Sequence, residues 1–375
     1  MHTPHLIQRT LAALAAASAI LVAHAQDIPV ASIQAATGGI AFAGAPYAKA
    51  IRLATDELNA KGGIHGRKVN LLERDSASDK GQAINLANQA IDRDRALLTL
   101  GPSATSDAVA VVPIFNDKKA PVLSFATSDA VLKSGPWSLK FQQSPAVPSP
   151  LVAKYVLEKT QIRKIAIVFD RTNEALIESK NFFRDAFKAG GGTVVAEEAT
   201  VSSDTNFVPL ATKLKSMDLD AVYLATYAEP SANILLQLRQ AGVPDKLRAI
   251  GTIALVSPKF IAVAGKAAEG TIAVADFVTG MDRPMNKAFE AAYKARYNEE
   301  PDSWAAVAYS LAQVGFAAIR EAGPNATREQ VRDAYFKLKD VPVVIGSGQW
   351  NQAERKPQYG AVVQVVQGGK FVAAP

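Results

Sequence analysis

The chain has 375 residues, of which 49% are hydrophobic and 20% are charged, and its formal net charge is +6. A chain of this length and composition is expected to form about two globular domains. The absence of cysteine excludes disulfides, thiolate metal sites, a cysteine nucleophile and a lipid-modified cysteine. Basic and acidic residues are interspersed, without a basic stripe that carries aromatic residues, so we expect no nucleic-acid binding.

Residues 1–25 have the pattern of a secretory signal: a short basic segment, an apolar run at 11–22 and the small-x-small site Ala23-His24-Ala25. The apolar run is about 12 residues long, which is too short to span a bilayer. We therefore predict cleavage near Ala25 and Gln26 and export of the mature protein. The mature chain would keep His65 as its only histidine, so histidine-rich metal sites and most serine hydrolase triads are excluded.

After Gln26, short apolar runs alternate with amphipathic stretches, which predicts strand and helix units around parallel sheets. The first helix is expected to begin near Pro46 and to end at Gly62-Gly63. Asp79 followed by Gln82 predicts the N-terminal cap of the next helix. The strands of this first series are expected at 28–34, 69–72, 97–100 and 122–125.

A second series of the same kind begins after the proline-rich segment 144–150, which predicts a change of direction between two lobes. Its strands are expected at 165–169, 194–196, 221–225, 249–251 and 271–277, followed by a helical region at 286–338 and two terminal strands at 361–366 and 371–373. Because the order of strand and helix occurs twice in tandem, the sequence predicts two similar α/β lobes with Rossmann-like sheets.

Two hydroxyl-rich loops follow neighbouring strands of the first series, at 101–107 and 124–129. In an open parallel sheet the ligand site lies at the carboxyl ends of the strands, and the free N–H groups at the start of a helix favour an anion. Thr105, Ser106, Thr127 and Ser128 are therefore candidates for binding one carboxylate. The alternative is that these residues are ordinary helix caps, because Ser and Thr are favoured at any helix start.

Two aromatic residues are placed to contact a ligand in the same region. Tyr227 follows the strand at 221–225, and Phe42 lies in the glycine-rich loop after the first strand. Packing on the loops of its own lobe is the alternative for Tyr227. A catalytic role is less favoured, because His65 lies in a glycine turn and no Gly-x-Ser-x-Gly motif, dinucleotide-binding turn or phosphate loop occurs. An exported hydrolase that uses a serine and a lysine remains as the alternative class.

Several segments resemble the periplasmic binding proteins of branched-chain amino acid type, which serve ABC importers. The segments are 56–69 (DELNAKGGIHGRKV), 75–79 (DSASD), 121–124 (PVLS), 203–207 (SDTNF), 220–223 (DAVY) and 267–271 (AAEGT). The resemblance covers essentially the whole mature chain. It implies a periplasmic binding protein of the type I fold, with two lobes joined by three crossover strands and the ligand in the cleft. It further implies a first lobe of residues 26–145 and 277–357 and a second lobe of residues 146–276 and 358–375.

The resemblance also implies roles for individual residues. The family's carboxylate-binding hydroxyl falls on Thr105, its contacts after the next strand fall on Ala126, Thr127 and Ser128, and its second-lobe tyrosine falls on Tyr227.

Two departures from the family pattern bear on the ligand. Amino-acid-binding members carry a glutamate for the ligand ammonium where this chain has Ile253, and a second family tyrosine is replaced by Glu174. An ammonium buried without a counter-charge would cost several kcal/mol, roughly, so an α-amino acid should bind poorly. The alternative is that Glu174 supplies the missing charge and that the ligand is a branched-chain amino acid.

We therefore expect a monomeric, periplasmic solute-binding protein, with no enzymatic activity, that captures an organic acid without an amino group, preferably an aromatic one. Its partners would be this ligand and a membrane ABC permease, and we expect neither a metal nor a cofactor. Thr105, Thr127 and Ser128 would hold the carboxylate, and Phe42, Tyr227 and Ile253 would enclose the apolar part.

Overall fold

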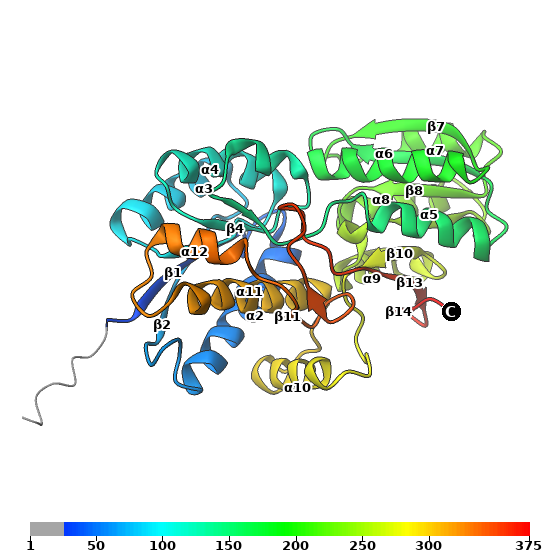
Figure 1. Cartoon of the computed structure of the whole chain (residues 1–375). Coiled ribbons are helices and arrows are strands. Elements are labelled where there is room, and N and C mark those ends of the chain that lie inside the picture. Colours follow the sequence, from blue (N-terminus) through cyan, green and yellow to red (C-terminus); the bar gives the residue numbers. More distant parts are fainter. Residues whose placement is uncertain (1–25) are drawn as a thin grey trace, which may run out of the picture.

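The computed structural model describes residues 26–375, so the predicted signal at 1–25 lies outside the described residues. The described chain forms two α/β lobes that lie side by side (Figure 1). Each lobe contains a parallel sheet covered by helices on both faces, as the tandem pattern predicts.

The first lobe is built on a five-stranded parallel sheet with the order β2-β1-β3-β4-β5. Its strands are β1 (Ile28–Gln34), β2 (Val69–Asp75), β3 (Leu98–Leu100), β4 (Val122–Ser124) and β5 (Ser138–Lys140). Helices α2 (Ala41–Ala60) and α11 (Ser303–Ala322) cover one face, and α3 (Lys80–Asn88) and α4 (Thr105–Asp117) cover the other. Successive side chains of β1 show this division, because Val30 packs with α2 and α11 whereas Ala31 packs with α3 and α4.

The second lobe contains a seven-stranded sheet with the order β14-β13-β10-β9-β8-β6-β7. Its parallel strands are β6 (Lys164–Asp170), β7 (Thr193–Thr200), β8 (Ala221–Ala225), β9 (Arg248–Gly251) and β10 (Ile272–Ala275). Helices α5 (Pro148–Lys159) and α6 (Glu174–Ala189) cover one face, and α7 (Val208–Lys215), α8 (Ala228–Gln240) and α9 (Pro258–Ala264) cover the other. The last two strands, β13 (Val362–Gln367) and β14 (Lys370–Ala373), extend this sheet in antiparallel pairing.

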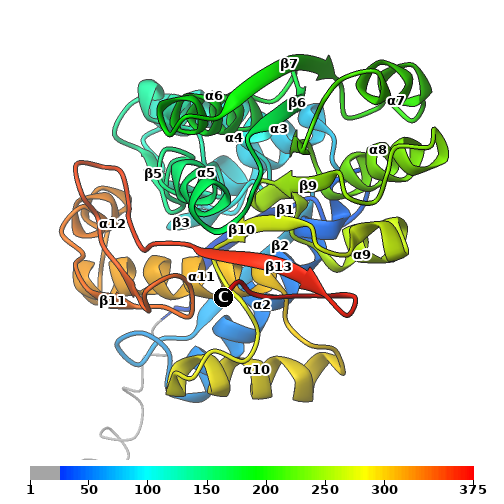
Figure 2. The ribbon, with the colours of Figure 1, turned by 90° about the vertical axis from the view of Figure 1, so that its right-hand side faces the viewer.

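The chain passes between the lobes three times, after β5, after β10 and before β13. The segment between the second and third passages returns to the first lobe and forms α10 (Pro284–Tyr297), α11, α12 (Arg328–Tyr335) and the short pair β11 (Val341–Pro342) and β12 (Gln349–Trp350). Figure 2 shows the result, with β13 from the end of the chain lying beside β10. The carboxyl ends of β1, β3 and β4 carry the loops that take part in the site.

Two predicted elements differ from those observed. Helix α2 begins at Ala41 rather than near Pro46, because its first turn packs against the end of β1 and extends the helix backwards past the proline. The helical region predicted at 286–338 is divided into three helices. Asn298 ends α10 in a left-handed conformation, and Gly323 ends α11 with a positive φ angle. Asp79 caps α3 by accepting a hydrogen bond from the backbone of Gln82, as predicted.

Within residues 26–375, no helix combines the length and apolar character needed to cross a membrane. The same residues contain no cluster of three or more His, Asp or Glu side chains that could hold a metal ion.

Candidate functional site

A pocket lies between the lobes at the carboxyl ends of the first-lobe strands. It encloses about 550 Å³ of space not filled by atoms, including the part open to solvent. Its lining residues come from both lobes and are Ile40, Phe42, Ala43, Tyr47, Ser103, Ala104, Thr105, Phe125, Thr127, Gln142, Asn173, Ala175, Leu176, Ser179, Tyr227, Thr252, Ile253, Ala254 and Trp304. We call this space the inner pocket.

Aromatic rings form much of its wall. Tyr47 stacks on Phe125 with the ring centroids 3.8 Å apart, and Trp304 meets the edge of Tyr47 at 5.8 Å. Phe42 from the first lobe contacts Tyr227 from the second lobe at 5.6 Å, also edge to face. These rings offer a flat apolar surface that suits a ring or a branched chain.

The polar end of the inner pocket lies at the start of α4. Thr105 is the first residue of this helix, and its hydroxyl oxygen accepts a hydrogen bond from the backbone N–H of Thr127 at 3.3 Å. The N-cap residue is Ala104, whose side chain cannot satisfy the free N–H groups of the first turn. Hydroxyl hydrogens and free N–H groups at a helix N-terminus are suited to hold a carboxylate.

Tyr227 is held in place by a residue of the same lobe. The Asn173 side chain accepts hydrogen bonds from the backbone of Ala175 and Leu176, which caps α6, and its Nδ2 donates to the Tyr227 hydroxyl at 2.9 Å. Burial raises the pKa of Tyr227 well above its ordinary value, so the hydroxyl stays protonated. Asn173 therefore links the cap of α6 to the orientation of the tyrosine.

Neither an acidic nor a basic side chain is found among the residues that line the inner pocket. Ile253 is part of this lining and presents an apolar side chain. Thr252 beside it caps the following short helix by accepting a hydrogen bond from Ala254 N at 3.1 Å. The inner pocket thus has hydrogen-bonding groups at one end and no charged partner for an ammonium.

The structure brings together five of the nine predicted site residues, since Phe42, Thr105, Thr127, Tyr227 and Ile253 all line the inner pocket. The others lie elsewhere. Ser106 lines a second, outer space, and Ala126 is fully buried and lines neither space. Glu174 is exposed at the start of α6 and is not among the residues that line the inner pocket, so its pairing with a ligand ammonium stays a prediction.

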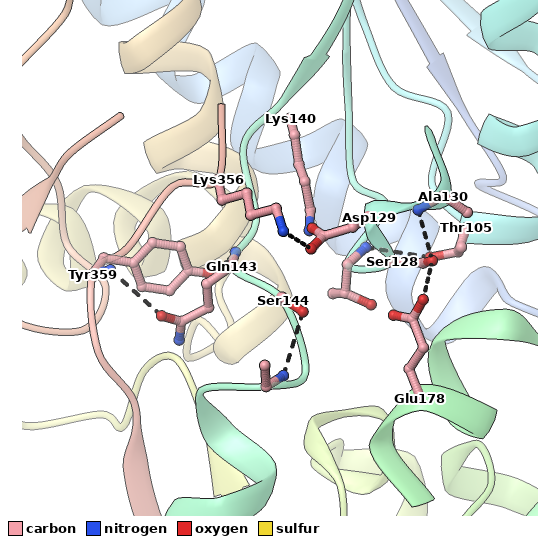
Figure 3. Close-up of polar contacts among 12 residues, drawn as sticks. Thr105, Ser128, Asp129, Ala130, Lys140, Gln143, Ser144, Glu178, Lys356 and Tyr359 are labelled. Carbon is pink, nitrogen blue, oxygen red and sulfur yellow. Dashed lines mark hydrogen bonds and ion pairs between the residues drawn. The ribbon is translucent and has the colours of Figure 1, made fainter. Parts of the chain in front are cut away.

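Ser128 was also expected to hold the ligand carboxylate, and in this structure its hydroxyl is engaged by the protein itself. The hydroxyl accepts a hydrogen bond from Ala130 N at 3.1 Å and donates to Glu178 Oε1, on α6 of the other lobe, at 2.7 Å (Figure 3). With both roles filled, the Ser128 hydroxyl has no hydrogen left to offer a ligand carboxylate.

Glu178 faces a cluster of charged residues from the first lobe and from the third passage between the lobes (Figure 3). Lys140 is fully buried and pairs with Asp129, which also pairs with Lys356 at 3.2 Å. Burial raises the pKa of the Glu178 carboxyl, while the Ser128 hydroxyl and the nearby Lys140 oppose this shift. The contact between the lobes thus brings an acidic side chain into the electrostatic field of a buried lysine.

Sequence reasoning missed several residues that line the inner pocket, among them Tyr47, Trp304 and Asn173. Tyr47 and Trp304 are buried residues of α2 and α11, and both helices reach the cleft there. Asn173 belongs to the loop after β6, and the rule that places ligands at the carboxyl ends of strands could have identified it.

Residues 27–370 match the model of the family described as periplasmic binding protein. A Leu/Ile/Val-binding protein of Escherichia coli strain K12 is 28% identical over 337 residues, which cover 88% of each chain. The branched-chain amino acid transporter substrate binding protein LivJ from Streptococcus pneumoniae, solved with isoleucine, is 25% identical with a TM-score of 0.85, and the match covers 92% of this chain and 98% of that chain.

A solute binding protein of an ABC transporter from R. palustris, solved with benzoate, has the same fold, with a TM-score of 0.82 at 19% identity over 92% of this chain and 95% of that chain. The family match spans nearly all of the described residues, and both lobes take part in these alignments. The chain therefore belongs to the periplasmic binding protein family of the branched-chain amino acid type, the substrate-binding proteins of ABC transporters, with the type I fold.

Proposed function

We propose that this protein is exported to the periplasm, binds a small carboxylate without an ammonium group, preferably an aromatic one, and delivers it to an ABC importer as a monomer without enzymatic activity or a cofactor. The observation that carries the proposal is the lining of the inner pocket, which has aromatic walls, hydroxyls beside a helix N-terminus and no acidic side chain. An ammonium enclosed by the residues that line the inner pocket would lose its hydration without gaining a counter-charge from any of them. A carboxylate would gain hydrogen bonds from Thr105, Thr127 and the first turn of α4.

Solved structures with this fold contain both kinds of ligand. The LivJ structure contains isoleucine, and the R. palustris structure contains benzoate, an aromatic acid that has no ammonium. The proposal places this chain with the second kind, because Ile253 lines the pocket where amino-acid-binding members are expected to carry an acid and because Glu174 lies outside the inner pocket.

Isothermal titration calorimetry with a matched set of acids tests the proposal. The protein is first unfolded and refolded to remove any retained solute, and mass spectrometry of the released material identifies that solute directly. Benzoate and phenylacetate should bind, whereas leucine and valine should bind at least tenfold more weakly. Tight binding of leucine with no binding of either aromatic acid would contradict the proposal.

The substitution Thr105→Val tests the polar end of the pocket. It keeps the shape of the side chain but removes the hydroxyl, so the free energy of benzoate binding should weaken by about 1.5–3 kcal/mol, the value of a hydrogen bond to a charged group. Thr212→Val on the exposed surface of α7 is the matched control and should leave the affinity unchanged. An unchanged affinity in Thr105→Val would remove this hydroxyl from the binding site.

A further inference from the structure

A second space lies outward of the inner pocket and is continuous with it. The two share Ile40, Phe42, Ala104, Asn173 and Tyr227. This outer chamber encloses about 1490 Å³, including the part open to solvent. Its remaining lining is mostly polar and consists of Gly39, Ser78, Lys80, Ser106, Asp107, Thr172, Ser202, Ser203, Asp204, Thr205, Glu229, Pro230 and Asn233.

The first turn of α4 lines both spaces. Ala104 and Thr105 face the inner pocket, and Ser106 and Asp107 face the outer chamber. A carboxylate held at Thr105 would therefore have Asp107 within about one helical turn. The part of a ligand nearest to Asp107 would be the atoms next to its carboxylate, while the rest of the molecule would extend toward Tyr47 and Trp304.

Asp107 is an unusual residue for this position. Asp107 is only 6% exposed, and its carboxylate oxygen Oδ2 has no hydrogen-bond partner. The Oδ1 atom has one long contact, 3.4 Å, with the hydroxyl of Ser106. Burial raises the pKa of Asp107, and the positive charge of Lys80 opposes the shift without forming an ion pair with it.

A buried carboxylate oxygen without a partner is rare, because each such group loses its hydration without compensation. Asp107 does not cap its own helix, since no side-chain cap is formed at the start of α4. A hydrogen-bond donor that enters the cleft with the ligand would satisfy the free oxygen. The donor would have to lie close to the ligand carboxylate.

We infer that Asp107 is a specificity-determining residue that accepts a hydrogen bond from a donor group, such as a hydroxyl, on the carbon atom next to the ligand carboxylate. This inference rests on the proposed function, and it narrows the ligand to 2-hydroxy acids with an aromatic or other apolar side chain. A simple carboxylate, which has no donor at this place, would leave Asp107 without a partner and facing another negative group.

Three acids that differ at one group test the inference: phenylacetate, mandelate, which adds a 2-hydroxyl, and phenylglycine, which adds a 2-ammonium. Calorimetry on the refolded wild-type protein should show that mandelate binds at least fivefold more tightly than phenylacetate. In Asp107→Asn and Asp107→Ala this preference should shrink below twofold, while phenylacetate should bind equally well or more tightly, because a neighbouring negative group has been removed.

Asp117→Asn, at the exposed last residue of α4, is the matched control and should keep the wild-type preference. Circular dichroism melting curves show whether each variant is folded, and the near-isosteric Asp107→Asn provides the test if Asp107→Ala does not fold. An equal loss of affinity for all three acids would assign Asp107 a structural role and overturn the inference.

The remaining outcomes separate the inference from the proposed function. Binding of phenylacetate without any preference for mandelate would overturn the inference and leave the proposed function standing. Phenylglycine could instead bind most tightly, and its advantage over phenylacetate could be lost in Asp107→Asn. This result would support recognition of a donor by Asp107 and would overturn the proposal that the ligand lacks an ammonium. Binding of none of the three acids, together with tight binding of leucine, would overturn both.

Discussion

Asp276 lies where the chain leaves β10 for its second passage between the lobes. It is an ionisable residue whose burial affects the stability of the protein. It is 2% exposed, and Gln143 Nε2 donates to its Oδ1 at 3.4 Å. Burial raises the pKa of this carboxyl to about 6, although hydrogen bonds from Tyr359 and Gln143 favour the charged form. Loss of hydration therefore outweighs the hydrogen bonds.

This balance predicts how stability depends on pH. An unfolded aspartate releases its proton near pH 3.8, whereas Asp276 in the fold keeps it until about pH 6. Between these values the folded protein binds more protons than the unfolded chain, so the free energy of unfolding falls as the pH rises, by roughly 3 kcal/mol in total. Urea titrations at pH 4 and pH 7 should show a smaller fall in Asp276→Asn than in the wild type. An identical fall in both would show that Asp276 titrates normally.

Single residues of the site could be predicted only where a structural rule applies, such as the rule that ligands bind at the carboxyl ends of parallel strands. Thr105 and Thr127 were identifiable because they follow buried strands, and the structure places both in the lining. Glu174 and Glu178 are one helical turn apart on α6, and no pattern in the sequence shows that Glu178 is the one that faces the first lobe. Which of the two glutamates faces the first lobe depends on how the lobes meet. The arrangement of the lobes depends in turn on contacts between residues far apart in the chain.

Among the elements, α2 shows how a helix start is fixed by contact rather than by helix propensity. Gly44 lies in its first turns, and a Cβ atom there would approach the backbone oxygen of Ala35 to 2.0 Å. Glycine therefore allows the helix to begin against the end of β1 and brings Phe42 and Tyr47 to the pocket.

Gly44→Ala should destabilise the protein although alanine is the better helix former. The gain in helix propensity is about 1 kcal/mol, but the clash involves backbone that must move, and overpacking of this kind costs about 1–3 kcal/mol. We expect a net loss in the free energy of unfolding, measured by chemical denaturation. Gly39→Ala, in the loop just before α2, is the control, because its Cβ would meet no atom within 4 Å. Equal stability of the two variants would argue against the close approach.

The elements themselves were largely predictable, but their boundaries were not. Buried strands such as β1 and β8 were evident because their residues form short apolar runs between turn signals. The start of α2 was placed too late because proline is favoured in the first turn of a helix, whereas Pro46 lies further inside. The short strand β5 has only three residues and carries a lysine, so it gives no periodic signal.

At the scale of the whole molecule, three contacts join the faces of the cleft. Phe42 meets Tyr227, the Trp304 indole donates to the backbone oxygen of Val256 at 3.0 Å, and Ser128 donates to Glu178. The structure is thus a closed form, and the Ser128–Glu178 bond is the one contact of the three that involves a charged group.

Removing the Glu178 carboxylate should favour the open form in the absence of ligand. A hydrogen bond to a charged group is worth about 1.5–3 kcal/mol, which corresponds to a change of roughly ten- to a hundredfold in the ratio of closed to open molecules. Small-angle X-ray scattering should give a larger radius of gyration for Glu178→Ala, and the emission of Trp304 should shift as its hydrogen bond to the other lobe breaks.

Glu174→Ala is the matched control for this experiment, because it removes the same group one turn earlier on the same helix, where it is exposed. It should scatter like the wild type. If Glu178→Ala also scatters like the wild type, the bond across the cleft does not contribute to closure.

The two-lobed organisation could be predicted from the repeated order of strands and helices, and the family resemblance added the discontinuous lobes. The charged cluster around Lys140 could not be predicted, because Asp129, Glu178 and Lys356 come from three distant parts of the sequence. The contact between the two lobes brings Glu178 to this cluster.

The position of α11 in the chain has a consequence for how the polypeptide matures. The side chains of Val30, Leu98 and Leu123 on the first sheet are covered by helix α11, whose first residue, Ser303, follows them by 273, 205 and 180 residues. Because the polypeptide is synthesised from its N-terminus, this apolar surface stays exposed until residues 303–322 have been made. The first lobe is therefore completed after most of the second has already been synthesised. Apolar surface that stays exposed for this time makes an unfinished chain prone to aggregation.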